Sequence, residues 1–319
     1  MAAYTQITLT QTHIDAARNS TDDFNPFHDP YKWRQIASNP FDSPIALGFQ
    51  LVALAAHEID VRRSRSQENH LVLSHGLHFS NYQFSFVDVC KPGDQIGITI
   101  KPTIIRLDST KQISNRLSVR AGRRLLFMGY QRETEFPMAL PTYDFSEMGE
   151  LHRQTDRSFI DGGRYFLKRK FMNNSNAKNF LVGSLVDQHY YFDELDNRVR
   201  YPPIFPVALI SCALLEKLQL ENYDFFNHPM VYTNHHLSVD RQLVGRLRSN
   251  DRLHLLVEGP QSAEVTGEGG LGGTEIPKIA YHCFGLVDGN QVLFRAKVLM
   301  ALLEHVITAL DARSKRREP

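Results

Sequence analysis

The sequence predicts an α+β fold in which one structural unit is used twice. In each half of the chain, a long apolar stretch with helical spacing is followed by several strand-like runs. This order, one helix and then strands, differs from the alternating strands and helices of a doubly wound parallel sheet. The length of 319 residues and the hydrophobic content of 42% are sufficient for two buried cores.

The first half begins with a short helix predicted over residues 13–19. Residues 20–33, rich in Pro, Asn and Asp, predict a loop. A long helix is expected over 45–62, because apolar residues recur there every three or four positions. Strands are expected in the runs 71–80, 82–90, 95–107, 113–122 and 124–136.

The second half repeats this order. Residues 137–175 carry many charges and show no sustained period, so they predict a connector with a domain boundary near residue 145. The two predicted domains are therefore residues 1–145 and 146–319. A second helix is expected over 201–220, and strands in the runs 231–239, 242–259, 278–289 and 291–303. A glycine-rich run at 267–273 predicts a flexible hairpin loop.

Spacing supports the repeat. Pro44 opens the first long helix and Asp94 ends a turn between strands 50 residues later, whereas Pro203 and Asp251 mark the same features 48 residues apart. We therefore expect the two domains to be copies of one another.

Charge and composition exclude several classes of function. Lys and Arg number 36 against 35 Asp and Glu, so the formal net charge of +1 favours neither nucleic acid nor an anionic membrane as a partner. The apolar runs are far shorter than the roughly 20 residues that a membrane-spanning helix needs. The first residues lack the features of a signal peptide, and Cys90, Cys212 and Cys283 lie far apart with no metal-ligand spacing. A cytoplasmic protein with neither a disulfide nor a metal is expected.

One loop holds residues suited to acid–base chemistry. The segment Asp23-Phe24-Asn25-Pro26-Phe27-His28 places a carboxylate and an imidazole five residues apart. Pro26 fixes its own φ, and Asn25 can tie the loop to its own backbone. Such a loop can direct both groups at one water molecule. The residues alone leave a purely structural turn open, since loops of Asp, Asn and Pro are common.

The wider pattern resembles a known family. The motif D-x-N-P-x-H, followed by F-x-x-P-I-A-x-G over residues 41–48, resembles the hydratase signature of MaoC-like hotdog-fold proteins. This family includes (R)-specific enoyl-CoA hydratases and 3-hydroxyacyl-thioester dehydratases. Residues 84–96 also resemble the strand pair of that family, with Ser85 and Val89 replacing its Arg and Pro. The resemblance extends over about residues 10–135.

The resemblance implies a double hotdog, in which each repeat is a long central helix wrapped by a curved antiparallel sheet. It implies a hydro-lyase of fatty acid metabolism that interconverts trans-2-enoyl and 3-hydroxyacyl thioesters of CoA or acyl carrier protein without a cofactor. Asp23 and His28 would form the catalytic pair, Asn25 would orient the water or the loop, and the Gly48 N–H would bind the thioester oxygen. Leu47 stands where many relatives carry His.

The second half lacks the motif. Counting back from Pro203 places Val182 at the position of Asp23, and Val207 corresponds to Gly48. One active site per chain is therefore expected, in the N-terminal half, with the C-terminal half as scaffold. Two alternatives are an acyl-thioester-binding module without catalysis and a hotdog thioesterase. A homodimer is left open.

Overall fold

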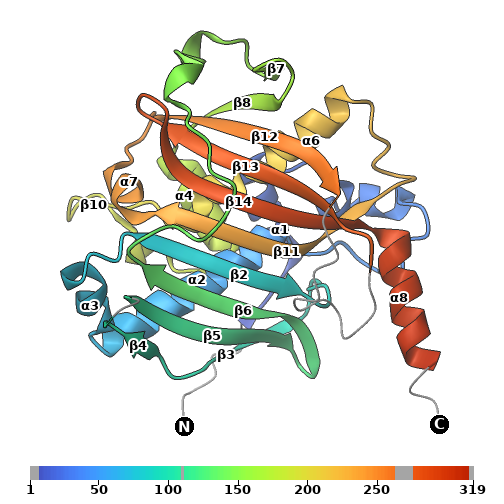
Figure 1. Cartoon of the computed structure of the whole chain (residues 1–319). Coiled ribbons are helices and arrows are strands. Elements are labelled where there is room, and N and C mark those ends of the chain that lie inside the picture. The colour runs from blue at the N-terminus through green and yellow to red at the C-terminus, as the bar shows by residue number, and fades with distance from the viewer. Residues whose placement is uncertain (1–6, 109–110, 263–275, 316–319) are drawn as a thin grey trace.

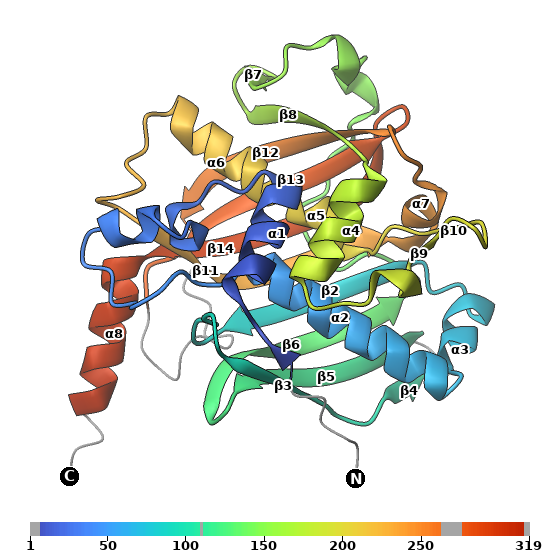
Figure 2. The ribbon, with the colours of Figure 1, turned by 180° about the vertical axis from the view of Figure 1, so that it is seen from behind.

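The structure is a computed structural model that describes residues 7–108, 111–262 and 276–315. The hairpin loop predicted at 267–273 lies outside these residues. Twelve described strands form one continuous, largely antiparallel sheet. The helices α1, α2 and α4 cover one face of this sheet (Figure 2). The segment between β6 and β7 crosses the opposite face (Figure 1), where the Met138 N–H donates to Asn81 Oδ1 at 3.0 Å.

The elements of the first half follow the predicted order, one long helix and then strands. They are β1 (Ile7–Thr8), α1 (Gln11–Thr21), the 3₁₀ turns η1 (Pro26–His28) and η2 (Lys32–Gln35), α2 (Gly48–Arg65), α3 (Glu68–Ser74), β2 (Phe79–Phe86), β3 (Gln95–Ile100), β4 (Ile104–Arg106), β5 (Gln112–Ala121) and β6 (Arg124–Thr134).

The second half has the same order with additions. Its elements are η3 (Ser146–Met148), η4 (Leu151–Arg153), β7 (Ser158–Ile160), β8 (Tyr165–Phe171), α4 (Asn174–Gly183), η5 (Gln188–Tyr190), β9 (Phe192–Asp193), β10 (Arg198–Val199), α5 (Ile204–Ala208), α6 (Ile210–Leu220), β11 (Met230–Asp240), α7 (Arg241–Arg246), β12 (Arg252–Ser262), β13 (Ile279–Val287), β14 (Gln291–Leu302) and α8 (Leu303–Lys315).

The sheet is arranged as two matching sets of strands. The order β3-β5-β6-β2 is followed by β11-β14-β13-β12, and β2 pairs with β11 where the sets meet. In chain order, β2 corresponds to β11 and β3 corresponds to β12. The strands of the second set therefore follow the same order outward from the junction as the strands of the first set. Next to the outer strands, β1 leads into α1 and β8 leads into α4. The predicted repeat is confirmed.

Helix α2 is the centre of the first repeat. Every residue from Phe49 to His57 is buried, so even its polar side chains need internal partners. The Gln50 side chain accepts from the Leu47 N–H at 3.2 Å and donates to the Gly183 carbonyl. Gly183 also allows α4 to approach α1 closely, because a Cβ there would lie 2.5 Å from the Ala17 nitrogen. The start of α2 is therefore tied to α4, which packs closely on α1.

Two predicted strand runs were wrong in part, because they begin as helices. Within 71–80, the chain remains in α3, and Val72 is buried in a small apolar cluster. Within 242–259, α7 precedes the strand. The Asp240 side chain accepts from the Leu243 N–H at 3.0 Å, which starts the helix at the end of β11.

The prediction that residues 137–175 lack regular structure was also wrong. They contain β8, which pairs with β12. The strand β8 was not predicted because it carries charged residues that are untypical of a buried strand. One of them, Lys168, is buried, and its Nζ lies 3.0 Å from Glu216 on α6. The predicted helix over 201–220 is interrupted at Leu209, and α8 after β14 was not predicted. No described helix is long and apolar enough to cross a membrane.

Candidate functional site

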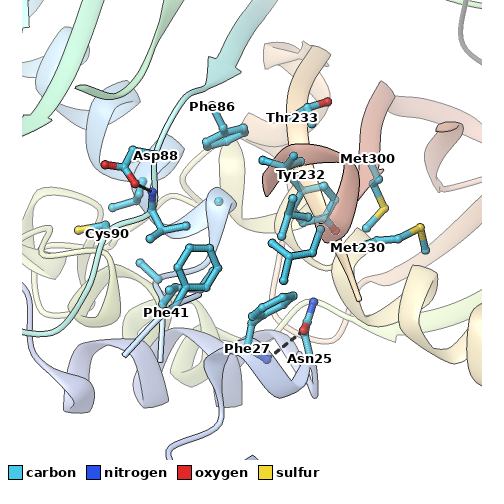
Figure 3. A pocket seen from close by; sticks show the side chains of 18 of the residues that line it. Asn25, Phe27, Phe41, Phe86, Asp88, Cys90, Met230, Tyr232, Thr233 and Met300 are labelled. Carbon is cyan, nitrogen blue, oxygen red and sulfur yellow. Dashed lines mark hydrogen bonds between the residues drawn. The ribbon is translucent and has the colours of Figure 1, made fainter. Parts of the chain in front are cut away.

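A mainly apolar cavity of about 130 Å³ lies between the two halves of the chain. It is bounded by the loop before η1, the start of α2, the end of β2 and the start of β11. Figure 3 shows Phe27 and Asn25 on one side of it and Phe86 and Tyr232 on the other. Of the four site residues predicted from the sequence, Asn25, His28 and Gly48 line this cavity.

The loop that carries the motif is shaped by local hydrogen bonds. Helix α1 ends at Asp22, whose φ of 53° is left-handed, and the Asp23 N–H donates back to the Arg18 carbonyl at 2.9 Å. The Asn25 N–H then donates to Asp23 Oδ1 at 2.9 Å, and the Phe27 N–H donates to Asn25 Oδ1 at 3.1 Å. Two successive turns of this kind, each closed by a side-chain oxygen, hold the loop in a single shape.

These turns also orient the Asn25 amide. Because Oδ1 is engaged by Phe27, the amide nitrogen is turned away from that bond, toward the side of the cavity where Met230 and Tyr232 lie (Figure 3). The Asn25 side chain thus presents hydrogen-bond donors to a ligand in the cavity.

His28 is held in a defined tautomer. Its Nδ1 lies 2.7 Å from the Ile45 carbonyl oxygen, and the Ile45 N–H donates to the Phe27 carbonyl at 3.0 Å. A carbonyl oxygen can only accept, so Nδ1 must carry the hydrogen and Nε2 of the neutral ring keeps its lone pair. The side chain is 6% exposed and lines the cavity. His28 is thus equipped to accept or return a proton at Nε2.

Asp23 is set deeper than the other three residues. It is 4% exposed and is absent from the cavity wall, with one oxygen engaged by the Asn25 N–H. Its charge nevertheless acts on a group that does line the cavity. Burial first, and then the Asp23 carboxylate, raise the pKa of the Tyr232 phenol well above its ordinary value.

Gly48 begins α2, so its N–H has no partner within the helix and lies at the positive end of the helix dipole. The packing around Gly48 leaves little room for a side chain. A Cβ at Gly48 would lie 3.2 Å from Phe86 Cζ and 3.3 Å from His235 Cε1. Two aromatic rings, rather than open space, fill the side where a larger residue would point.

Comparisons with known proteins identify the fold. No family model matches the chain, and no curated protein matches it in sequence. Solved structures do match. A MaoC-like dehydratase shares 7% identity at a TM-score of 0.53, with 94% of this chain and 97% of that chain covered. A MaoC domain protein dehydratase of Chloroflexus aurantiacus shares 9% identity at a TM-score of 0.54, with 93% of each chain covered.

A third match decides the architecture. A conserved protein of Mycobacterium tuberculosis, described as having a double hotdog fold, shares 12% identity at a TM-score of 0.54 over 93% of each chain. The chain is a double hotdog. At identities of 7–12% these matches establish the fold alone.

The second hotdog also contributes to the cavity, which the sequence did not reveal. Met230, Tyr232 and Thr233 reach it from β11, and Met300 from β14 (Figure 3). Strand-like runs could be recognised in the sequence, but no signal showed which side chains would face the first hotdog. These residues come from β11, which pairs with β2, and from β14, which pairs with β11, so their place at the site is set by the packing of the two hotdogs.

The second hotdog has a loop that corresponds to the motif loop. Here Leu185 has the left-handed φ of 61°, and the Val186 N–H donates back to the Leu181 carbonyl at 2.9 Å, so Val186 takes the place of Asp23. Asp187 accepts from a following N–H and begins η5, as Asn25 begins η1, and Tyr190 takes the place of His28. The residue that corresponds to Asp23 is thus Val186, four residues after Val182, where the spacing from Pro203 had predicted it.

This corresponding region has different chemistry. Tyr190 lines a polar cavity of about 1050 Å³, and its hydroxyl donates to Asp60 Oδ2 at 2.6 Å. The residues that correspond to Asp23 and His28 are thus a valine and a tyrosine, although the described wall of this cavity also includes His57, Asp60, Asp187 and His189. Within the described residues, no group of three His, Cys, Asp or Glu side chains is placed to hold a metal ion.

Proposed function

We propose that this protein interconverts a trans-2-enoyl thioester and a 3-hydroxyacyl thioester, carried by CoA or an acyl carrier protein. The observation that carries the proposal is the convergence of His28, Asn25 and the first N–H of α2 on one mainly apolar cavity. An imidazole with a free Nε2 lone pair and a helix N-terminus are the two parts that addition of water to an enoyl thioester requires.

The residues have separate roles in this reaction. In hydration, the oxygen of water bonds to C3 of the acyl group and a proton is delivered to C2. His28 Nε2 and the Asp23 carboxylate are the acid–base pair that takes the proton from water and supplies the proton to carbon. Asn25 directs its amide hydrogens to the water or the substrate. Dehydration uses the same groups in the reverse order.

The thioester oxygen gains negative charge as the C–O bond forms. The Gly48 N–H and the dipole of α2 are suited to stabilise that charge, since hydrogen-bond donors aimed at developing charge act strongly in a site shielded from water. The mainly apolar wall, which includes Phe27, Phe86 and Met300, suits the hydrocarbon part of an acyl group.

The test is a panel of enoyl-CoA and 3-hydroxyacyl-CoA thioesters followed by the absorbance of the enoyl thioester. With a substrate that the wild type converts, Asp23→Asn and His28→Ala are each expected to lower turnover by roughly 10²–10⁴-fold, with unchanged far-UV circular dichroism. The matched control is Asp22→Asn. Asp22 is the adjacent carboxylate, 62% exposed and paired with Lys170, and this variant is expected to keep full activity.

The same panel separates the rival functions. Wild-type turnover that survives in both Asp23→Asn and His28→Ala would refute the assignment of the pair. Binding of acyl-CoA with no change in enoyl absorbance for any member of the panel would favour a binding module. Release of free CoA thiol would favour a thioesterase.

A further inference from the structure

The cavity of the candidate site is closed on its inner side by a packed group of aromatic rings. Phe86 and Tyr232 line the cavity, and the His235 ring lies behind both, with its centroid 4.8 Å from each of theirs. His235 in turn stacks on Phe49 of α2 at 4.2 Å, and both of these residues are fully buried. Rings at these separations are in direct contact, so a hydrocarbon chain cannot pass between them.

Two of these rings share one face of the sheet because of an irregularity in β11. The pairing of β11 with β14 shifts between Tyr232 and Asn234, so that Thr233 is an extra residue. Successive side chains of a regular strand point to opposite faces, and one extra residue reverses that alternation. Tyr232 and His235, three residues apart, therefore both pack on Phe49 of α2.

The polar cavity that Tyr190 lines does not extend this space. The first cavity borders α2 at Gly48 and Leu51, whereas the wall of the second cavity begins on this helix at Ala56. No described residue belongs to both walls. An acyl chain in the first cavity therefore cannot continue into the larger one.

Another part of the wall comes from the end of β14 and the start of α8. Met300 of β14 lies in it (Figure 3), followed by Leu303 and Val306 of α8. The Leu303 N–H donates to the Pro229 carbonyl at 2.9 Å, and the Leu303 side chain is buried in the apolar cluster that contains Phe27. The start of α8 is therefore a packed boundary of the cavity.

The volume of the cavity limits the group that it can hold. An apolar protein cavity of about 150 Å³ takes one molecule of benzene, a ring of six carbon atoms. The cavity here has a volume of about 130 Å³. By this comparison it has room for about four to six carbon atoms.

We propose that the protein acts on thioesters of short acyl groups, with about four to six carbon atoms. Phe86, supported from behind by His235, and Val306 of α8 set this limit. The inference rests on the proposed function for the reaction and adds the size of the acyl group. It gives the second hotdog, which supplies His235 and α8, a part in selecting the substrate.

The first test measures binding and does not depend on turnover. Saturated acyl-CoA thioesters from acetyl-CoA to dodecanoyl-CoA are titrated into the protein by isothermal calorimetry. Each methylene buried in the cavity should tighten binding about fourfold, and the gain should end between butanoyl-CoA and hexanoyl-CoA. Affinity that continues to rise through dodecanoyl-CoA would overturn the inference.

Two variants should move this limit in opposite directions. Phe86→Ala removes a ring from the wall and should extend the gain by about two or more carbon atoms. Val306→Phe fills space beside α8 and should end the gain at butanoyl-CoA or earlier. The matched control is Phe171→Ala, which removes an exposed ring from β8 and should leave the limit unchanged. Circular dichroism shows which variants are folded, and a limit that stays in place in a folded Phe86 or Val306 variant would refute the role of that residue.

Turnover separates this inference from the proposed function. Among the corresponding 2-enoyl-CoA thioesters, kcat/KM for hydration should be highest for butenoyl-CoA or hexenoyl-CoA and at least about tenfold lower for dodecenoyl-CoA. If the wild type hydrates dodecenoyl-CoA as efficiently as hexenoyl-CoA, the size limit fails and the proposed function stands. If short acyl groups bind as expected but no enoyl thioester is hydrated, the size limit stands and the proposed function fails.

Discussion

Glu133 offers the most quantitative test of how the two hotdogs are held together. Its carboxylate is 1% exposed and lies 2.7 Å from Arg63 Nη1 on α2 and 3.2 Å from Arg241 Nη1 on α7. Ser80 and Gln131 also donate to it, at 2.5 and 2.8 Å. One buried anion thus joins the central helix of the first hotdog to a helix of the second.

The perturbation is Glu133→Gln, which keeps the shape and removes the charge. Burial alone would raise the pKa of Glu133, but Arg241 and Arg63, with the hydrogen bonds from Gln131 and Ser80, lower it from 4.5 to about 2. At roughly 1.4 kcal/mol for each pKa unit, this fall corresponds to about 3 kcal/mol of stability at neutral pH. Removing one partner of a buried ion pair costs about 3–5 kcal/mol, so the two magnitudes agree.

The sign of the pH dependence follows from the direction of the shift. The folded-state pKa lies below the unfolded value, so the stabilisation is complete above about pH 5.5 and is lost as the pH falls from about 4.5 toward 2. The difference in unfolding free energy between the wild type and Glu133→Gln should therefore shrink on acidification. Urea unfolding followed by far-UV circular dichroism at pH 7, 5, 4 and 3 measures it.

A matched control is two residues away. Glu135 is 40% exposed and pairs with Lys111 at 3.5 Å, so Glu135→Gln should cost less than about 0.5 kcal/mol at every pH. The reasoning is refuted if Glu133→Gln is as stable as the wild type at pH 7, or if the difference between them is the same at pH 7 and pH 3.

Three further substitutions test the packing around the site. Gly48→Ala should cost about 1–2 kcal/mol in urea unfolding and lower kcat, since the Phe86 and His235 rings lie 3.2 and 3.3 Å from the added Cβ and must shift; an unchanged enzyme would contradict this. His235 has no partner for either ring nitrogen and burial lowers its pKa to about 3, so the unfolded chain alone binds a proton as the pH falls below 6.5. The unfolding free energy of His235→Phe, relative to that of the wild type, should therefore be about 2 kcal/mol higher at pH 5 than at neutral pH. A difference that does not grow on acidification would count against this explanation. Gly183→Ala, whose Cβ would lie 2.5 Å from the Ala17 nitrogen, should cost at least about 2 kcal/mol, whereas Gly245→Ala, with open space around it, should cost nothing.

The shape of the motif loop could be predicted from sequence because its geometry is local, whereas the roles expected of its residues came from the family resemblance. The bonds that shape the loop join residues two or three positions apart, as between Asn25 and Asp23 or Phe27 and Asn25. Pro26 restricts the same segment. Contacts between residues so close in the chain can be anticipated from the residue types alone.

The errors in the predicted fold have a common cause. The short helices α3 and α7 lie in runs whose apolar residues also suit a strand, and β8 carries charges that are paired only after folding. Lys168, for example, is buried beside Glu216, 48 residues away in the chain. Local pattern cannot reveal a partner that distant, so propensity was overridden by tertiary contacts.

The sequence by itself determined the repeated order of helix and strands, the shape of the motif loop and the difference between the two halves. Only the tertiary structure decided how deep Asp23 lies, that two aromatic rings leave little room for a side chain at position 48, and that Tyr232 faces the cavity. The physical reason lies in the register of β11. One extra residue at Thr233 reverses which side chains face inward, and the pairing of β11 with β2 and β14 determines that register.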